Sequence, residues 1–123
     1  MIQVTVDVGY AYDMHSIALV KCHKVPSARS EINWGRIDLD ILNQLGRDLH
    51  STILDSPEYK RLYEVNLHLY DLVDLAKTDA VKASEVDQGV YERWLAKKAL
   101  QEKFFPATQY QEQKFGYAQA PTV

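Results

Sequence analysis

The sequence predicts a mainly α-helical domain, a bundle of about four helices with a short β-strand at the N-terminus and an irregular aromatic tail at the C-terminus. Apolar residues recur at helical spacing along four segments, and Pro, Gly or polar breaks separate these segments. Only the first eight residues alternate with the period of a strand. With 123 residues the chain has the size of one domain, residues 1–123, and is long enough to bury a core without disulfides or a metal.

The N-terminal stretch is expected to form a half-buried strand. Ile2, Val4, Val6 and Val8 alternate with polar residues, and Gly9 follows. A single strand among helices needs a partner for its backbone groups. We expect this partner to be either the C-terminal tail or the same strand of a second copy, and the second arrangement would give a homodimer.

The next two elements are helices joined by a loop. The first helix is expected over residues 10 to 24, and Pro26 ends it. Residues 27 to 35 are polar and predict a loop, although part of this stretch has enough helical character for one turn. A second helix is expected over residues 37 to 55, and it tolerates Gly46 in its interior.

The third helix has the clearest beginning. Ser56 is a good N-cap, Pro57 occupies a position where no backbone donor is lost, and Glu58 complements the positive end of the helix dipole. The helix is expected to run to about residue 77, and its apolar stripe consists of Leu62, Val65, Leu69, Leu72, Val73 and Ala76.

Ser84 is expected to cap a fourth helix that runs to about Phe105, where Pro106 ends it. The remaining residues, 107 to 123, mix glutamines with aromatic side chains. They predict an irregular tail that is partly packed by its aromatic residues.

One edge of the third helix carries tyrosines and an asparagine. At about 100° per residue, Tyr59, Tyr63, Asn66 and Tyr70 lie in one narrow sector, which Asp74 continues. Such an edge suits stacking on and hydrogen bonding to a planar or sugar ligand. It also suits a helix contact in which the rings are buried and Asn66 bonds to another helix. Spacing alone does not separate the two interpretations, and the structural one is favoured.

Charge and cysteine content limit the partners and the compartment. Seventeen acidic and fourteen basic residues give a net charge of -3, so the basic excess that nucleic-acid binding needs is missing. No apolar run approaches the roughly 20 residues that span a bilayer. The single Cys22 and the absence of a signal-peptide pattern at the N-terminus favour a cytoplasmic protein that binds neither nucleic acid nor membranes.

Motifs of metal or catalytic chemistry are not recognised. No two of the four histidines lie three or four residues apart on one helix, so neither a metal site nor a cofactor is expected; they are His15, His23, His50 and His68. Asp38 and Asp40 diverge on a helix and do not predict an acid and base pair. The basic strip of the last helix favours a solvated face over a phosphate site; it consists of Arg93, Lys97, Lys98 and Lys103.

Three segments together resemble a small uncharacterised family of bacterial and phage proteins: GYAYDMHSIALVK (9–21), YKRLYEVNLHLYDLVD (59–74) and QEQKFGY (111–117). The matching positions are Gly9, Asp13, Ser16, Ile17, Lys21, Leu62, Tyr63, Asn66, Leu69, Tyr70, Glu112, Lys114 and Tyr117, whereas Met14 replaces a lysine common in that family. The family has no known function, but its members are often encoded near glycosyltransferase and surface-sugar genes. The resemblance therefore implies a link to sugars or nucleotide sugars.

Two functional hypotheses follow. The favoured one is a small helical interaction protein that self-associates and is not an enzyme. The alternative is a protein, possibly enzymatic, that binds a sugar, a nucleotide sugar or another phosphorylated small molecule. In this alternative Asp13 and Asn66 orient polar groups of the ligand, and Tyr63 and Tyr70 stack on it. Lys21 or Arg93 binds its phosphate.

Overall fold

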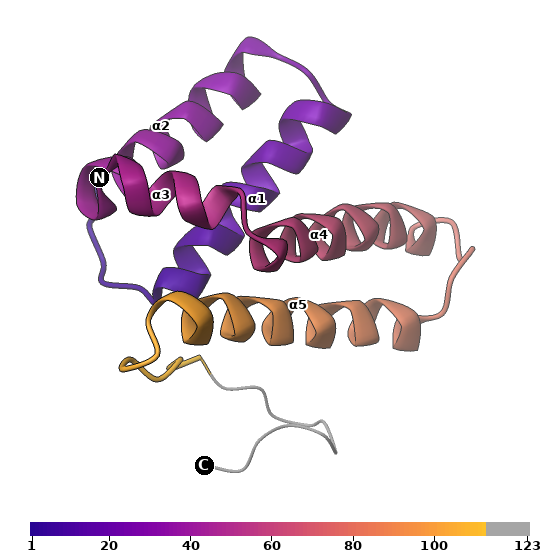
Figure 1. The fold of residues 1–123 in the computed structure, drawn as a ribbon. Helices are drawn as coiled ribbons and strands as arrows, with labels where there is room; N and C mark the ends of the chain where they lie inside the picture. Colours follow the sequence, from indigo (N-terminus) through magenta and orange to yellow (C-terminus); the bar gives the residue numbers. More distant parts are fainter. Residues whose placement is uncertain (113–123) are drawn as a thin grey trace.

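The computed structural model describes residues 1–112 and contains, in this range, five helices: α1 (Val8–Lys24), α2 (Ala28–Leu45), α3 (Arg47–Leu54), α4 (Pro57–Ala76) and α5 (Ala83–Phe104). In Figure 1, α4 and α5 run side by side in opposite directions and α1 crosses them. Helix α2 returns beside α1, and the short α3 leads into α4. The prediction of a mainly helical protein is confirmed.

The predicted N-terminal strand is wrong. Residues 1–7 have no regular structure, and Ile2, Val4 and Val6 are exposed. Among residues 1–112 no segment pairs with this stretch, so its alternating pattern has no sheet to complete. Val8, which was predicted to end the strand, already belongs to α1.

Gly9 is the point at which α1 and α5 approach each other. Its N–H donates a hydrogen bond to Gln101 Oε1 at 3.1 Å. A Cβ atom on Gly9 would lie 2.4 Å from the carbonyl oxygen of Lys97 and 3.1 Å from a ring carbon of Tyr110. Gly9 therefore does not end an element, as its position in the sequence suggested, but permits a close helix contact.

The predicted loop over residues 27–35 is also wrong. Ser27 caps α2 by accepting a hydrogen bond from Ser30 N at 3.1 Å, and the helix begins at Ala28. The predicted second helix is in fact two helices. Gly46 adopts φ 87°, a region that favours glycine, and this residue separates α2 from α3.

The remaining boundaries lie close to the predicted ones. Ser56 accepts a hydrogen bond from Tyr59 N at 3.1 Å, which confirms the predicted N-cap of α4. Helix α5 begins at Ala83, but the N-cap predicted at Ser84 is wrong, because Lys82 is the N-cap and Ser84 lies inside the helix. The hydrophobic core between the helices consists of Tyr12, Ile41, Ile53, Tyr59, Leu62, Ala96 and Leu100.

The start of the C-terminal tail packs on the same chain. Trp94 Nε1 donates to the carbonyl oxygen of Glu112 at 2.9 Å, and Tyr110 is buried beside Trp94. Asp7 Oδ2 accepts hydrogen bonds from the backbone N–H groups of Gln111 and Glu112. The rest of the predicted tail, residues 113–123, lies outside the described residues.

Within residues 1–112, none of the helices combines the length and the apolar composition that crossing a bilayer would require.

Candidate functional site

A buried polar centre joins α1, α4 and α5. Asn66 Nδ2 donates hydrogen bonds to Asp13 Oδ1 at 2.9 Å and to Ser16 Oγ at 2.7 Å. Lys97, which is 1% exposed, places Nζ 3.7 Å from Asp13 Oδ2 and 2.6 Å from Glu112 Oε2. Both carboxylate oxygens of Asp13 thus have a partner, as a buried charge requires.

This centre is occupied by the protein's own groups. Asp13 and Asn66 are 4% and 5% exposed, and their polar atoms bond between helices. For Asn66 this agrees with the interpretation in which the tyrosine edge makes a helix contact and Asn66 bonds to another helix. The expectation that Lys97 faces solvent is wrong, because Lys97 is drawn inside by two carboxylates.

A hollow of 300 Å³ lies beside the polar centre, between α1, α4 and α5. Asn66, Tyr70 and Arg93 are among the residues that line it. The Nε atom of Arg93 lies 4.0 Å from Asp13 Oδ2 and makes no hydrogen bond. At the same hollow Lys77 and Asp74 pair at 3.4 Å and Arg93 faces Asp13, so each cation of the lining has an acidic neighbour.

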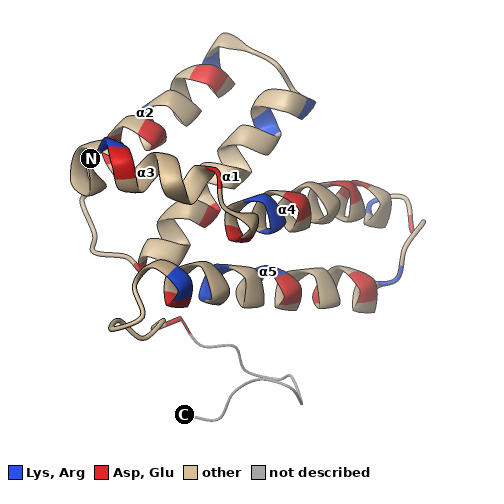
Figure 2. Cartoon of the chain, viewed as in Figure 1, with Lys and Arg blue, Asp and Glu red and all other residues tan. Residues whose placement is uncertain are grey.

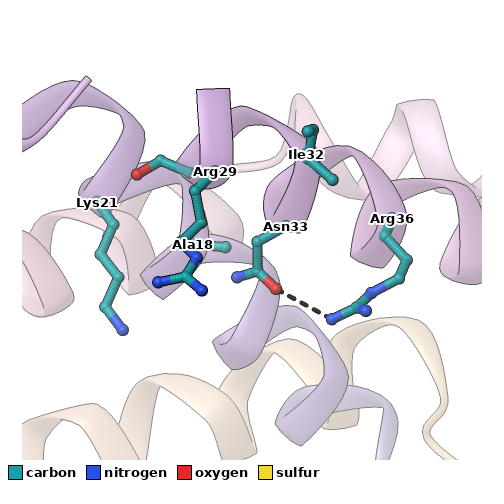
Figure 3. A pocket seen from close by; sticks show the side chains of 7 residues that line it. Ala18, Lys21, Arg29, Ile32, Asn33 and Arg36 are labelled. Atoms are coloured by element: carbon teal, nitrogen blue, oxygen red, sulfur yellow. Dashed lines mark hydrogen bonds between the residues drawn. The ribbon is translucent and has the colours of Figure 1, made fainter. Parts of the chain in front are cut away.

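A larger hollow of 760 Å³, the cationic pocket, lies between α1 and α2. Figure 3 shows Lys21 reaching into it from α1 and Arg29, Asn33 and Arg36 reaching into it from α2. The guanidinium of Arg36 donates a hydrogen bond to Asn33 Oδ1 at 3.2 Å. The complete lining is Ala18, Lys21, Arg29, Ser30, Ile32, Asn33 and Arg36.

The cations of the cationic pocket have no ion-pair partner in the part of the chain that the structure describes. No acidic residue lines the pocket, and Lys21, Arg29 and Arg36 take part in none of the ion pairs within residues 1–112. Figure 2 shows basic segments of both helices toward the loop that joins α1 and α2. Three cations gathered in one hollow produce a positive potential on a chain whose net charge is -3.

A third cluster, the histidine–aspartate cluster, consists of His15, Asp38 and His50 from α1, α2 and α3. Both imidazole Nε2 atoms lie 2.8 Å from the same oxygen, Asp38 Oδ1. On their other sides, His15 Nδ1 bonds to the Tyr59 hydroxyl at 2.6 Å and His50 Nδ1 bonds to the Tyr12 hydroxyl at 2.7 Å. The result is a hydrogen-bonded chain of five side chains.

Burial and the Asp38 charge determine protonation in this cluster. Burial is the largest influence on His15 and lowers its pKa below 6.5, although the hydrogen bond and charge of Asp38 oppose this. Burial also acts to raise the pKa of Asp38, but the hydrogen bonds from His50 and His15 outweigh it and hold that pKa below 3.8. Burial and the Asp38 charge raise the pKa values of Tyr12 and Tyr59 above 10. At neutral pH the cluster therefore holds an aspartate, a neutral His15 and two tyrosine hydroxyls.

The six residues predicted to bind a ligand do not form one site. Asp13, Asn66 and Arg93 meet at the polar centre, and Tyr70 lines the hollow beside it. Lys21 instead lines the cationic pocket. Tyr63 bonds through its hydroxyl to His23 Nδ1 and lines neither hollow.

Reasoning from the sequence missed two groups of residues. Arg29 was assigned to a loop, and the cationic pocket exists only because this stretch is helical. The sequence gives no signal for the histidine–aspartate cluster, because ligand spacing relates residues of one helix, whereas the members of this cluster come from three helices. Cys22 and His23 are adjacent in the chain, but neither belongs to that cluster.

Comparison of the chain with protein-family models, with curated proteins and with solved structures found no match. Any function must therefore be argued from the chemistry of the sites themselves.

Proposed function

We propose that the protein binds a phosphorylated small molecule, of the sugar-phosphate or nucleotide-sugar class, in the cationic pocket. One observation carries the proposal: Lys21, Arg29 and Arg36 line a single hollow that has no acidic lining residue. An anion with several oxygens would relieve the repulsion among these three charges.

The residue types in the pocket suit a phosphate. Arginine can hold two phosphate oxygens at once through its planar guanidinium, and lysine adds a mobile positive charge. Ser30 and Asn33 also line the pocket and offer neutral groups for the hydroxyls of a sugar. Its 760 Å³ can hold a small molecule, and the hollow is open to solvent, since Lys21, Arg29 and Arg36 are exposed.

The proposed ligand site differs from the one expected on the tyrosine edge of α4. Asp13 and Asn66 are buried and bonded to other residues, so they have little capacity left for a ligand. Lys21 is the one residue of the predicted set that lines the cationic pocket. The resemblance to a family encoded near surface-sugar genes supports the same ligand class. The proposal concerns binding and assigns no catalytic residue.

Calorimetric titration tests the proposal, with UDP-glucose and inorganic phosphate as charged probes and methyl glucoside as a neutral one. The double variant Arg29→Gln/Arg36→Gln removes two cations, while Lys60→Gln removes an exposed cation of α4 as a matched control. A hydrogen bond to a charged group contributes about 1.5 to 3 kcal/mol. We expect the double variant to weaken UDP-glucose binding at least about tenfold and the control to leave it unchanged. Equal binding by wild type and double variant would refute the site.

A second candidate function is self-association through the N-terminal segment. Ile2 and Val4 are 90% and 73% exposed, and no other described residue covers them. An extended segment with free backbone groups and alternating apolar side chains can pair with the same segment of a second copy. Light scattering on wild type and on Ile2→Ser/Val4→Ser tests this idea. A dimer that the substitution converts to a monomer would support it, and a monomeric wild type would exclude it at the concentration used.

A further inference from the structure

Three atoms of types that bind transition metals converge in the histidine–aspartate cluster. His15 Nε2, His50 Nε2 and Asp38 Oδ1 belong to three different helices, and the cluster's ligand atoms lie within 4.8 Å of one another. His15 and His50 are 1% and 4% exposed, whereas the Asp38 side chain is 26% exposed. The cluster is thus buried but reaches solvent on the aspartate side, where an ion can enter.

We propose that His15, Asp38 and His50 bind a divalent transition-metal ion of the Zn²⁺ type. Two imidazole nitrogens and one carboxylate oxygen form a set of three protein ligands, as in zinc sites that keep a fourth position for water. Carboxylate with imidazole favours such a metal over Mg²⁺ or Ca²⁺, which prefer oxygen ligands alone. The proposal does not depend on a ligand in the cationic pocket.

The tyrosine hydroxyls fit the proposed coordination. Without a metal, the Nε2 atoms of His15 and His50 share hydrogen bonds with Asp38, and their Nδ1 atoms share hydrogen bonds with the hydroxyls of Tyr59 and Tyr12. With a metal on Nε2, the imidazole carries its proton on Nδ1 and donates it to the oxygen of the same tyrosine. A metal-bound histidine usually has such a partner on its other nitrogen. Both states therefore leave every imidazole nitrogen satisfied.

Admitting an ion requires all three ligand atoms to adjust. With Zn–N and Zn–O bonds of about 2.0 to 2.1 Å, tetrahedral ligand atoms lie about 3.3 Å apart. The two His–Asp distances are 2.8 Å, so each must lengthen by about 0.5 Å. The two imidazole nitrogens, which lie within 4.8 Å of each other, must reach the same separation, so the imidazoles turn together with Asp38.

The indole N–H of Trp34, which lies next to the histidine–aspartate cluster, has no hydrogen-bond acceptor within residues 1–112. The indole of Trp34 lies edge-on to His15 with ring centroids 5.6 Å apart, and its Nε1 is buried without a hydrogen-bond partner. Buried donors are normally bonded. A hydroxide in the fourth coordination position of the metal would be an acceptor of the kind that this indole lacks.

The test uses the untagged full chain, freed of metals with a chelator and titrated with ZnCl₂ in a calorimeter. CoCl₂ is a second probe, because four-coordinate Co²⁺ shows visible absorption that hydrated Co²⁺ lacks. Asp38→Asn keeps the hydrogen-bond acceptor but removes the anionic ligand, and His50→Gln removes an imidazole. His68→Gln is the matched control, since His68 is an exposed histidine of α4 outside the cluster.

We expect one Zn²⁺ per chain, binding weakened more than about 100-fold in Asp38→Asn and His50→Gln, and no change in His68→Gln. The expected loss exceeds the 10- to 100-fold cost typical of altering a residue behind the ligands. Circular dichroism of the metal-free proteins shows whether each variant folds. If His50→Gln does not fold, Asp38→Asn alone decides the outcome. No saturable binding by wild type, or unchanged binding by folded Asp38→Asn, would overturn the metal site and leave a purely hydrogen-bonded cluster.

Discussion

Because α1 and α5 are in close contact at Gly9, adding one methyl group at this position should destabilise the protein. In Gly9→Ala the new Cβ would lie 2.4 Å from the Lys97 carbonyl oxygen, whereas ordinary contacts begin at 3.4 Å. This oxygen is a backbone atom inside α5, so no change of side-chain rotamer can remove the clash. The two helices must therefore separate locally by up to about 1 Å, given the close packing of protein interiors.

The cost of this separation can be estimated from two contributions. Overpacking of a well-packed core costs about 1 to 3 kcal/mol. Weakening the hydrogen bond from Gly9 N–H to Gln101 adds up to about 1 kcal/mol. Alanine recovers less than about 1 kcal/mol of helix propensity, since Gly9 lies in the first turn. A net loss of about 1 to 3 kcal/mol follows, which lowers the melting temperature by roughly 4 to 12 °C in a chain of this size.

Gly35→Ala is the matched control. Gly35 lies inside α2 and its added Cβ would meet no atom within 4 Å, so the same change should stabilise the protein by about 0.5 to 1 kcal/mol. Urea unfolding followed by circular dichroism measures both free energies. The reasoning would be refuted if Gly9→Ala were as stable as wild type, or if both substitutions shifted stability in the same direction.

Three further predictions concern the polar clusters. Lys97→Met should cost about 3 to 5 kcal/mol in urea unfolding, because it leaves Asp13 buried without its lysine. Lys98→Met loses a 3.9 Å pair with Glu102 and a cation 5.4 Å from the Trp94 ring centroid, so it should cost less than about 2 kcal/mol, and similar losses for the two variants would contradict the account. Asn66→Ala should cost about 1 to 3 kcal/mol by removing the donor to Asp13, whereas an unchanged melting temperature would exclude a packing role. Stability should fall as the pH drops below 6.5, because the unfolded chain protonates His15 at a pH where the folded chain does not, and a second fall should follow below 3.8 from Asp38. Denaturation at a series of pH values checks this, and greater stability at pH 5 than at pH 7 would contradict it.

Local signals predicted those parts of the fold that depend on neighbouring residues. Ser56 and Pro57 start α4 as expected, since an N-cap acts within one helical turn. Gly46 alone is tolerable inside a helix, but its φ of 87° marks the turn from α2 to α3, which no local pattern contains. The strand over residues 1–8 failed for a related reason, because alternation does not tell whether a partner strand exists.

The candidate sites were less predictable than the helices. The position of Asn66 beside the apolar stripe of α4 and the family resemblance at Asp13 predict the two residues separately, and the structure joins them across 53 positions of sequence. His15, Asp38 and His50 gave no signal because helix spacing relates only residues of the same helix. Lys97 was assigned to solvent because its burial depends on two carboxylates that other segments supply.

Helix α2 contributes to both proposed sites, yet the two can be separated by experiment. At about 100° per residue, positions 29, 33 and 36 fall in one sector of about 60°, and positions 34 and 38 lie about 140° to 180° from position 29. The cationic pocket and the histidine–aspartate cluster therefore use opposite faces of α2. Arg36→Gln should weaken UDP-glucose binding and leave Zn²⁺ binding intact, and Asp38→Asn should do the reverse. If each substitution abolished both, α2 would be moving as a unit, and neither local assignment would explain the binding.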